Sequence, residues 1–362
     1  MTNREKEILQ WIEENPLISQ NELAEKANIT RSSVAVHISN LIKKGKIIGK
    51  GYIIKKNDFI TVIGGANVDI AGIPNDILKE NDSNPGEIKF SLGGVGRNIA
   101  ENLARLNQDI NLITILGDDL HGIDIKKQCK ELNINISNSL IVPNGKTSTY
   151  LFVLDETKDM KVAISAMDIF DKLTVDFIIN KLDIINKSSI CILDTNPPQD
   201  TIEYIANNCT VPLFVDCVST KKAKKIENIL SKIHTLKPNK LEAEFLSNIK
   251  IKNDDDLEKC ANFFIEKGIK QVFISLGKDG VFYSNGIEKG KLNTLSKKVV
   301  NSTGAGDAFM AGIAYGYTNG ENIKDACLYG LSASAITLSC ENTINENLTI
   351  ENLITLKEEY TL

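Results

Sequence analysis

The stretch VVNSTGAGDAFMAGIA (299–314) combines glycines, one carboxylate and an apolar run in an order that could do chemistry. A strand-like ending at 297–300 runs into a turn of small residues at 302–306, and apolar residues then recur at helical spacing. The start of a helix leaves backbone N–H groups without acceptors, so this turn could hold a phosphate or a developing negative charge. Asp307 lies in the first helical turn, where it could accept a proton.

Three further stretches place glycines or polar side chains where a ligand could bind. They are SLGGVGRNIAENLARLN, with a Gly-Gly pair before a helix; KPNKLEAEFL, with an Asn and a Glu three residues apart; and ISLGKDGVFY, with a glycine turn after a strand. Each alone is typical of a tight turn, a surface pair or a common loop. Together with the first stretch, in this order, they favour a functional site. The positions concerned are Gly93, Gly94, Asn98, Asn239, Glu242, Ser275, Gly277 and Gly280.

The elements that must position these residues follow from the alternation of the chain after residue 58. Strand-like apolar runs alternate there with amphipathic helices, and the runs are FITVIGGANVDI, INLITILG, SICILDT, PLFVDCV and QVFISLG. This alternation predicts an α/β fold with a mostly parallel sheet flanked by helices. Ligands of such sheets bind beyond the carboxyl ends of the strands. Polar residues at those ends are Asn67, Asp69, Asp194, Asp216, Asn239 and Ser275.

Length and composition indicate a two-domain globular protein of 362 residues, with 42% hydrophobic and 25% charged residues. No apolar run reaches the roughly 18 residues that span a bilayer, and the first residues lack an apolar signal core, so we expect a cytoplasmic protein with no membrane contact. Seven cysteines without a CxxC pair predict reduced thiols. Three scattered histidines make a zinc cluster improbable, so any metal should be a hard cation bound by oxygen.

Residues 1–58 carry 10 Lys and Arg against 7 Asp and Glu, whereas the remainder carries 32 against 40. Within this first part, apolar periodicity predicts helices at 3–14, 19–27 and 31–45, the second with a capping box of Ser19 and Glu22. We expect the third helix to bury Val34, Ile38, Leu41 and Ile42. Glycines at 45, 49 and 51 break the apolar residues that follow, which predicts a small hairpin, or wing.

Three helices and a wing resemble a winged helix-turn-helix domain over residues 1–57. In that family the third helix enters the major groove and the wing contacts phosphate. An uninterrupted basic stretch at 31–57 favours DNA as the partner. The alternative is a small docking or dimerisation domain with solvated charges. The expected DNA contacts are Arg31, Ser32, Ser33, His37, Asn40, Lys46 and Lys50.

The four glycine-bearing stretches, over residues 58–362, resemble both signature regions of the ribokinase-like (PfkB) family of sugar and nucleoside kinases. The resemblance implies a kinase that uses ATP and Mg²⁺, with Asp307 as catalytic base and the N–H groups around Gly304, Ala305 and Gly306 stabilising the transferring phosphoryl group. The sugar would be held by Asn67, Asp69, Gly93, Gly94 and Asn98. ATP would be bound by Asn239, Glu242, Ser275, Gly277 and Gly280, with Glu242 reaching Mg²⁺ through water.

The resemblance also implies a small β lid over the sugar, at about 83–92 and 147–167, which in some relatives forms a dimer interface. We therefore expect a homodimer. The family commonly has Asp where this chain has Asn301, near a loop that can bind a monovalent cation. This departure puts K⁺ dependence in doubt, although the loop at 339–345 still offers carbonyl oxygens. The structural alternative is that Asn301 only caps the turn.

Within the family, GGANVDI, GGVGRNIAENLARL and NSTGAGDA look most like pseudouridine kinases, which phosphorylate the 5′-hydroxyl of a C-nucleoside. The alternatives are a kinase for another nucleoside such as inosine, or for free ribose or fructose. A further alternative is a transcription regulator whose kinase-like domain only senses a nucleoside. Asp307 and its glycine turn argue against that reading, because a sensor needs no base. An enzyme that also binds DNA remains open.

Overall fold

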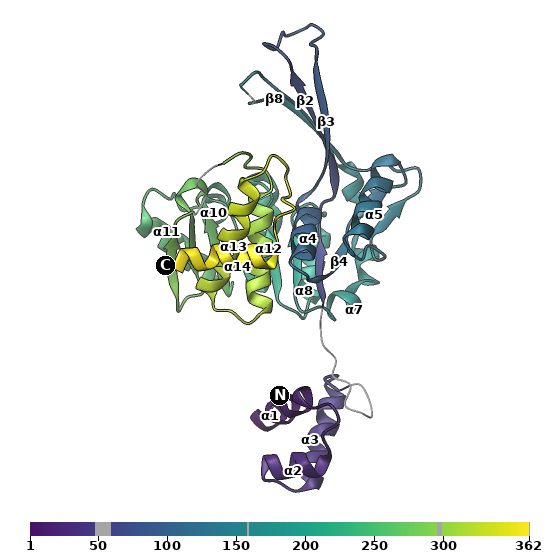
Figure 1. Cartoon of the computed structure of the whole chain (residues 1–362), viewed down its shortest axis with the longest axis vertical. Coiled ribbons are helices and arrows are strands. Elements are labelled where there is room, and N and C mark those ends of the chain that lie inside the picture. Colours follow the sequence, from purple (N-terminus) through teal and green to yellow (C-terminus); the bar gives the residue numbers. More distant parts are fainter. Residues whose placement is uncertain (48–58, 158, 295–298, 362) are drawn as a thin grey trace. The chain divides into compact units, whose positions relative to one another are not determined.

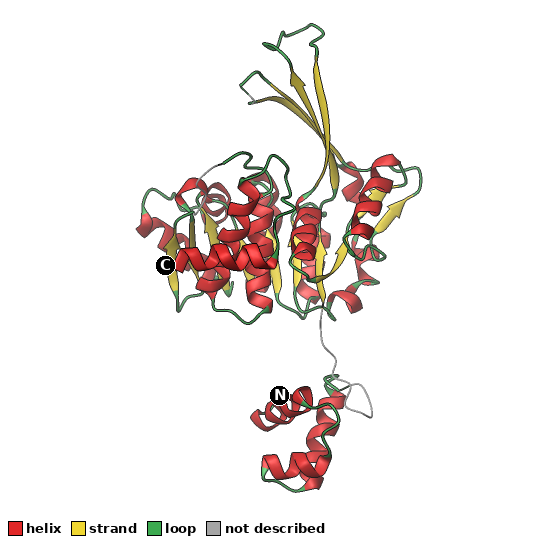
Figure 2. Cartoon of the chain, in the orientation of Figure 1, coloured by secondary structure: helices red, strands yellow, loops and turns green. Residues whose placement is uncertain are grey.

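The computed structural model describes residues 1–47, 59–157, 159–294 and 299–361. The chain divides into two compact units, Met1–Asn57 and Asp58–Leu362. Figure 1 labels the elements along the chain, and Figure 2 shows helices and strands by colour. Among the described residues, no helix is long and apolar enough to cross a membrane.

The first unit contains helices α1 (Asn3–Glu14), α2 (Gln20–Ala27) and α3 (Arg31–Lys43). Thr2 with Glu5, and Ser19 with Glu22, form capping boxes at the first two helices, and Thr30 caps the third. The helices enclose one apolar cluster, made of Ile8, Ile12, Ile18, Leu23, Val34, Ile38, Leu41 and Ile47.

One expectation for this unit is wrong, and another falls outside the described residues. The burial predicted for Ile42 is wrong, because Ile42 follows Leu41 by one residue and turns to the solvent side of α3, where it is 47% exposed. Most of the predicted wing, including Lys50, falls on residues 48–57. These residues lie outside the described part of the chain.

The second unit is built on an eight-stranded sheet in the order β14-β13-β12-β11-β10-β9-β1-β4. Pairing is parallel from β12 to β4 and antiparallel for β13 and β14, which confirms the predicted α/β class. The strands are β1 (Phe59–Ile63), β4 (Asp109–Ile113), β9 (Cys191–Asp194), β10 (Leu213–Asp216), β11 (Thr235–Lys237), β12 (Gln271–Ser275), β13 (Val281–Ser284) and β14 (Lys289–Leu292).

Helices cover both faces of this sheet because successive strand side chains point to opposite sides. In β9, for example, Leu193 packs into one apolar cluster and Ile192 into the other. The helices are α4 (Val95–Arg105), α5 (Leu120–Glu131), α6 (Val175–Ile179), α7 (Leu182–Ile185), α8 (Gln199–Asn208), α9 (Thr220–Ala223), α10 (Lys240–Ser247), α11 (Asp254–Glu266), α12 (Ala305–Thr318), α13 (Ile323–Leu338) and α14 (Ile350–Thr361), with 3₁₀ turns η1 (Asp168–Lys172), η2 (Lys224–Lys232) and η3 (Gly277–Asp279).

A second sheet projects away from the first, as Figure 1 shows. Its order is β3-β2-β7-β8, from strands β2 (Asn67–Pro74), β3 (Gly86–Gly93), β7 (Thr149–Leu154) and β8 (Met160–Ala166). We call this four-stranded sheet the lid. A separate pair, β5 (Ile115–Gly117) and β6 (Leu140–Val142), lies outside both sheets.

The sequence runs do not map one to one onto strands. FITVIGGANVDI is not a single strand: β1 and β2 belong to different sheets, and residues 64–66 between them are in neither strand. The prediction of a strand-like ending at 297–300 is wrong for the two residues that the structure describes, because Val299 and Val300 lie outside any strand. The Val300 N–H instead donates to the Leu338 carbonyl at the end of α13.

Candidate active site

Asp307 sits at the start of α12, in the geometry that the glycine turn predicts. Gly304 has a φ of 82°, and a Cβ there would lie 2.2 Å from the Thr343 carbonyl oxygen, so only glycine fits without strain. The helix then begins at Ala305, which leaves the first N–H groups of α12 without intrahelical acceptors. Asp307 is 9% exposed at the third helical position.

The surroundings of Asp307 are polar and charged. Its Oδ2 accepts a hydrogen bond of 2.7 Å from the Asn98 side-chain amide on α4. Burial raises the pKa of Asp307 to about 7, and the negative charge of Asp216 adds to this rise, while the Asn98 hydrogen bond and Lys237 oppose it. A carboxyl group with a pKa near neutrality can take and return a proton at physiological pH.

Lys237 supplies a buried positive charge at the same place. Its Nζ lies 2.9 Å from Asp216 Oδ2, and both side chains are more than 90% buried. A Cβ on Gly306 would lie 3.2 Å from Lys237 Nζ, so the ammonium group adjoins the first turn of α12. Burial works against the charge on Lys237, but Asp216, Asp307 and Glu242 outweigh it and raise its pKa. Sequence analysis missed this lysine. The feature that could have identified it is a charged residue at the end of the short strand β11.

The residues predicted to hold the sugar come together at the base of the lid. Asn67 on β2 pairs in register with Gly93 on β3, and the Asn67 amide donates to Asp69 Oδ1 at 2.6 Å. A Cβ on Gly93 would lie 2.3 Å from Asp69 Oδ2, so glycine makes room for this carboxylate. Burial raises the pKa of Asp69 against the opposing effects of Asn67 and Arg97. Gly94, with a φ of 98°, caps the helix that carries Asn98.

Asp194 at the end of β9 holds the loops on which these residues lie. Its Oδ2 accepts from the N–H groups of Gly65 at 2.7 Å and Gly96 at 2.9 Å, and its Oδ1 accepts from the Asn196 N–H at 2.8 Å. Asp194 is 1% exposed, and burial raises its pKa. The sequence places Asp194 at a strand end but does not reveal that it anchors both glycine loops.

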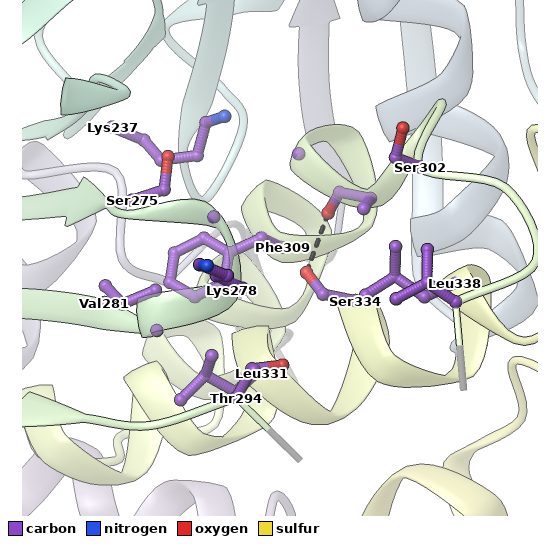
Figure 3. Close-up of a pocket in the computed structure, with 15 residues that line it drawn as sticks. Lys237, Ser275, Lys278, Val281, Thr294, Ser302, Phe309, Leu331, Ser334 and Leu338 are labelled. Atoms are coloured by element: carbon purple, nitrogen blue, oxygen red, sulfur yellow. Dashed lines mark hydrogen bonds between the residues drawn. The ribbon is translucent and has the colours of Figure 1, made fainter. Parts of the chain in front are cut away.

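A cavity of about 390 Å³ opens beside the start of α12. Its lining includes Ser275, Gly277 and Gly280 of the predicted nucleotide site, and Ala305 and Gly306 of the predicted anion turn. Gly304, Asn239 and Glu242 are not among the lining residues. The Ser334 hydroxyl donates to the Ala305 carbonyl at 2.7 Å. Phe309 and Val281, both labelled in Figure 3, give the cavity an apolar wall. A flat heterocycle fits such a wall, with its phosphates toward α12.

Asn239 and Glu242 form a capping box at α10, a role that their spacing did not reveal. The Glu242 N–H donates to Asn239 Oδ1 at 2.9 Å, and the Asn239 N–H donates to Glu242 Oε2 at 2.8 Å. Glu242 is 3% exposed, and burial together with the charge of Asp216 raises its pKa. Glu242 is buried beside the charge of Asp216, and a carboxylate in such a place suits a hard cation such as Mg²⁺ nearby. The described residues offer no cluster of three His, Cys, Asp or Glu for a metal, so the remaining ligands would be phosphate and water oxygens.

Asn301 links the turn before α12 to the loop at 339–345. Its Nδ2 donates to the Glu341 carbonyl at 2.8 Å, and its Oδ1 accepts from the Thr303 N–H at 2.9 Å. An aspartate could make the second contact but not the first, because an ionised carboxylate has no proton to donate. Asn301 therefore caps the turn and also engages one carbonyl of the loop.

The predicted DNA contacts are partly accessible. Arg31, Ser32 and Lys46 are exposed, and Ser33, His37 and Asn40 are half-exposed. The Ser33 N–H donates to Thr30 Oγ1 at 3.2 Å, which caps α3. Arg31, Ser32, Ser33, His37 and Asn40 lie on α3, and Lys46 follows its end.

The fold, the helix start with its buried carboxylate and the adjoining cavity define a ribokinase-like phosphotransferase. Comparisons with known proteins agree. Residues 57–350 match the pfkB family of carbohydrate kinases, and residues 1–48 match the winged helix-turn-helix DNA-binding family. The chain therefore belongs to the pfkB carbohydrate kinase family, and it is a nucleoside or sugar kinase.

Three relatives show the extent of the similarity. A pseudouridine kinase of Escherichia coli is 40% identical over 306 residues, 84% of this chain and 98% of that protein. The E. coli sugar kinase YeiI is 35% identical over 358 residues, 98% of this chain and 99% of that protein. A crystal structure from Clostridium perfringens, described as a sugar kinase, superposes with a TM-score of 0.76 at 37% identity, covering 83% of this chain and 96% of that one.

We expect Asp194→Asn to lower the free energy of unfolding by about 1–3 kcal/mol, because either orientation of the amide turns an NH₂ group toward a backbone N–H. Urea denaturation followed by circular dichroism measures this. Asp183→Asn is the control, since Asp183 is 81% exposed and forms a surface ion pair with Lys187. Equal midpoints for the two variants would contradict the anchoring role of Asp194.

Proposed function

We propose that the protein transfers the γ-phosphoryl group of ATP to the 5′-hydroxyl of pseudouridine, with Asp307 as general base. The observation that carries the proposal is the buried carboxyl of Asp307, with a pKa of about 7, at a helix start that borders the cavity. The choice of pseudouridine is supported by the 40% identity to the pseudouridine kinase. Inosine, ribose and fructose are the alternatives that the experiment below compares.

The proposed chemistry follows from the positions of the charges. Asp307 removes the proton of the hydroxyl as the hydroxyl oxygen attacks the γ-phosphorus, and the bond from this phosphorus to the departing ADP breaks. The N–H groups at Gly304–Gly306 and the ammonium group of Lys237 stabilise the charge on the transferring phosphoryl group. Glu242 would hold Mg²⁺ through water, and the ion would supply positive charge beside the phosphates. Asn239 holds Glu242 by the capping box, and Ser275, Gly277 and Gly280 line the nucleotide.

The acceptor is held on the other side of Asp307. Asp69 and Asn67 bind sugar hydroxyls from the first strand of the lid, and Asn98 binds both the sugar and Asp307. Gly93 and Gly94 leave space for the ring beside the backbone, because neither carries a side chain. The lid excludes water, which protects the phosphoryl group from hydrolysis.

Asp307→Asn should lower kcat roughly 100- to 10,000-fold while nucleotide binding persists, because the amide cannot accept the proton. In the wild type, kcat/KM should rise with pH through a midpoint near 7, since the protonated carboxyl below that pH is inactive. The assay uses Mg-ATP with pseudouridine, inosine, ribose and fructose, and we expect pseudouridine to be preferred.

Asp325→Asn is the matched control, because Asp325 occupies the same third position of α13 but pairs with Lys357. It should retain full activity. If Asp307→Asn keeps wild-type turnover, the carboxylate serves only the helix dipole and the proposed base is wrong. If ribose or inosine is preferred by a wide margin, the acceptor is wrong and the phosphotransfer stands.

We propose in addition that residues 1–57 bind DNA through α3. The match to a winged helix-turn-helix DNA-binding family and the exposed Arg31 and Lys46 support this. Ser32, Ser33, His37 and Asn40 are the candidate base contacts, and Lys50 would add a phosphate contact. In this reading the protein is an enzyme with a regulatory DNA-binding unit.

An electrophoretic shift of the gene's own promoter at low salt, with and without nucleoside, tests the DNA proposal. Lys46→Ala should reduce the slope of log affinity against log salt by about one, because one phosphate contact is lost. Lys6→Ala, on α1, is the control and should leave the slope unchanged. Absence of a shift at low salt would remove the proposal, and a kinase-inactive chain that still shifts DNA would favour the nucleoside-sensing regulator.

We also propose that the lid mediates a homodimer. Strand register places Phe90, Ile70, Leu151 and Ile164 in one row across all four strands, and Ile88, Val153 and Val162 in the next, so these side chains share one face. Asp69 lies in the row with Ser91, Tyr150 and Ser165, on the opposite face. Phe90 is 64% and Ile164 62% exposed, and a second copy of the same sheet would cover them.

Light scattering should give the mass of a dimer for the wild type and of a monomer for Phe90→Lys, because a charge in the centre of an apolar interface is desolvated without a partner. Ala163→Lys is the control, since Ala163 is in register with Phe152 and lies on the face opposite to Ile164. A wild-type monomer at high protein concentration would contradict the proposal.

A further inference from the structure

Arg97 is a buried cation that no predicted role accounts for. It is 2% exposed, in the first turn of α4. Its Nη1 donates to the Leu92 carbonyl at 2.7 Å and to Asn98 Oδ1 at 2.8 Å. Its Nη2 donates to Gln128 Oε1 at 2.7 Å and to Glu101. The guanidinium thus joins the end of β3, α5 and two side chains of its own helix.

The ion pair with Glu101 alone does not explain this guanidinium. Arg105 also binds Glu101, with Nε and Nη2 donating to Oε1 at 3.1 and 2.8 Å. One carboxylate is therefore shared by two arginines, and the negative charge of Asp69 also acts on Arg97. The helix could keep a Glu101–Arg105 pair without a second arginine, whereas among the described residues it is Arg97 that donates to the Asn98 amide oxygen.

The contact to Asn98 decides which end of the amide faces Asp307. The amide nitrogen donates to Asp307 Oδ2 at 2.7 Å, and the amide oxygen accepts from Arg97. If the amide were reversed, its oxygen would face a carboxylate oxygen and its NH₂ group would face a guanidinium, so both contacts would become repulsive. Without Arg97, only the contact to Asp307 still favours the observed orientation of the Asn98 amide.

We propose that Arg97 is a positioning residue: it fixes the Asn98 amide so that its nitrogen faces Asp307, and it ties this contact to the Leu92 carbonyl at the end of lid strand β3. The inference rests on the proposed role of Asp307 as base. Arg97 itself does not touch the reacting atoms.

The consequence for pH follows from the groups that face Asp307. Asp216 on β10 and Asp194 on β9 disfavour its negative charge, and Lys237 on β11 and the Asn98 amide on α4 favour it. When the amide is free to turn away, one of the two favourable contributions is lost. The pKa of Asp307 then rises further, so the base is protonated at a higher pH.

The test is the pH profile of kcat/KM for Arg97→Met with Mg-ATP and the acceptor that the wild type prefers. We expect the acid limb to move upward by about one pH unit, since a single hydrogen bond to a charged group shifts a pKa by this order. Turnover should fall most near pH 6.5 and least near pH 9. If the midpoint of the acid limb of Arg97→Met is the same as that of the wild type, the proposal is overturned, whatever the level of activity.

Arg105→Met is the matched control, because it removes the other arginine from Glu101 and leaves the Asn98 contact intact. It should change stability but not the midpoint of the limb. In an Asn98→Ala background, Arg97→Met should move the limb no further, since the amide through which it acts is gone. Equal shifts for Arg97→Met and Arg105→Met would show a purely structural role.

If Arg97→Met does not fold, Arg97→Lys is the test variant. Lysine keeps the charge near Glu101, but one ammonium group cannot donate to Leu92, Asn98, Glu101 and Gln128 together. The limb should move in the same direction by a smaller amount, and no movement would again overturn the proposal. Failure of the proposed function is distinguishable, because then Asp307→Asn itself would retain turnover.

Discussion

The structure of the kinase unit depends on keeping one carboxyl group, that of Asp307, buried among charges of both signs. Burial and Asp216 disfavour its ionisation, and Asn98 and Lys237 favour it, so its pKa lies at about 7. Each of these partners comes from a different element: Asn98 from α4, Asp216 from β10 and Lys237 from β11. The balance of charges around Asp307 therefore exists only when the sheet, α4 and α12 are in place.

The glycine loops serve this arrangement by allowing close approach of backbone segments. A Cβ on Gly96 would lie 2.7 Å from the Gly64 backbone, and one on Gly94 would lie 2.5 Å from the Gly65 carbonyl oxygen. The two loops are thus packed directly on each other, and Asp194 binds an N–H from each. Because these contacts join the chain near β1 to the start of α4, they set where Asn67, Asp69 and Asn98 can lie.

The lid shows how a single sheet can serve two surfaces. Alternation along its strands places Asp69 and Ser91 on one face and Ile70, Phe90 and Ile164 on the other. The proposed sugar contact of Asp69 and the proposed dimer contact of Phe90 therefore use opposite faces. Both depend on the register between β2, β3, β7 and β8, since a shift by one residue would exchange the two faces.

The sequence by itself determined the features whose contacts are local. The glycine turn before Asp307, the capping box of Ser19 with Glu22 and the apolar runs of the central strands depend on neighbours a few residues away, so their patterns are readable in the chain. Only the tertiary structure decided that Lys237 adjoins Gly306 and that Arg97 reaches Asn98, Leu92 and Gln128 together. It also decided that FITVIGGANVDI divides between two sheets and that Ile42 is exposed. The contact between Asn98 and Asp307 joins residues 209 positions apart, and no local pattern encodes such a distance, because it is fixed by how the whole sheet packs its helices.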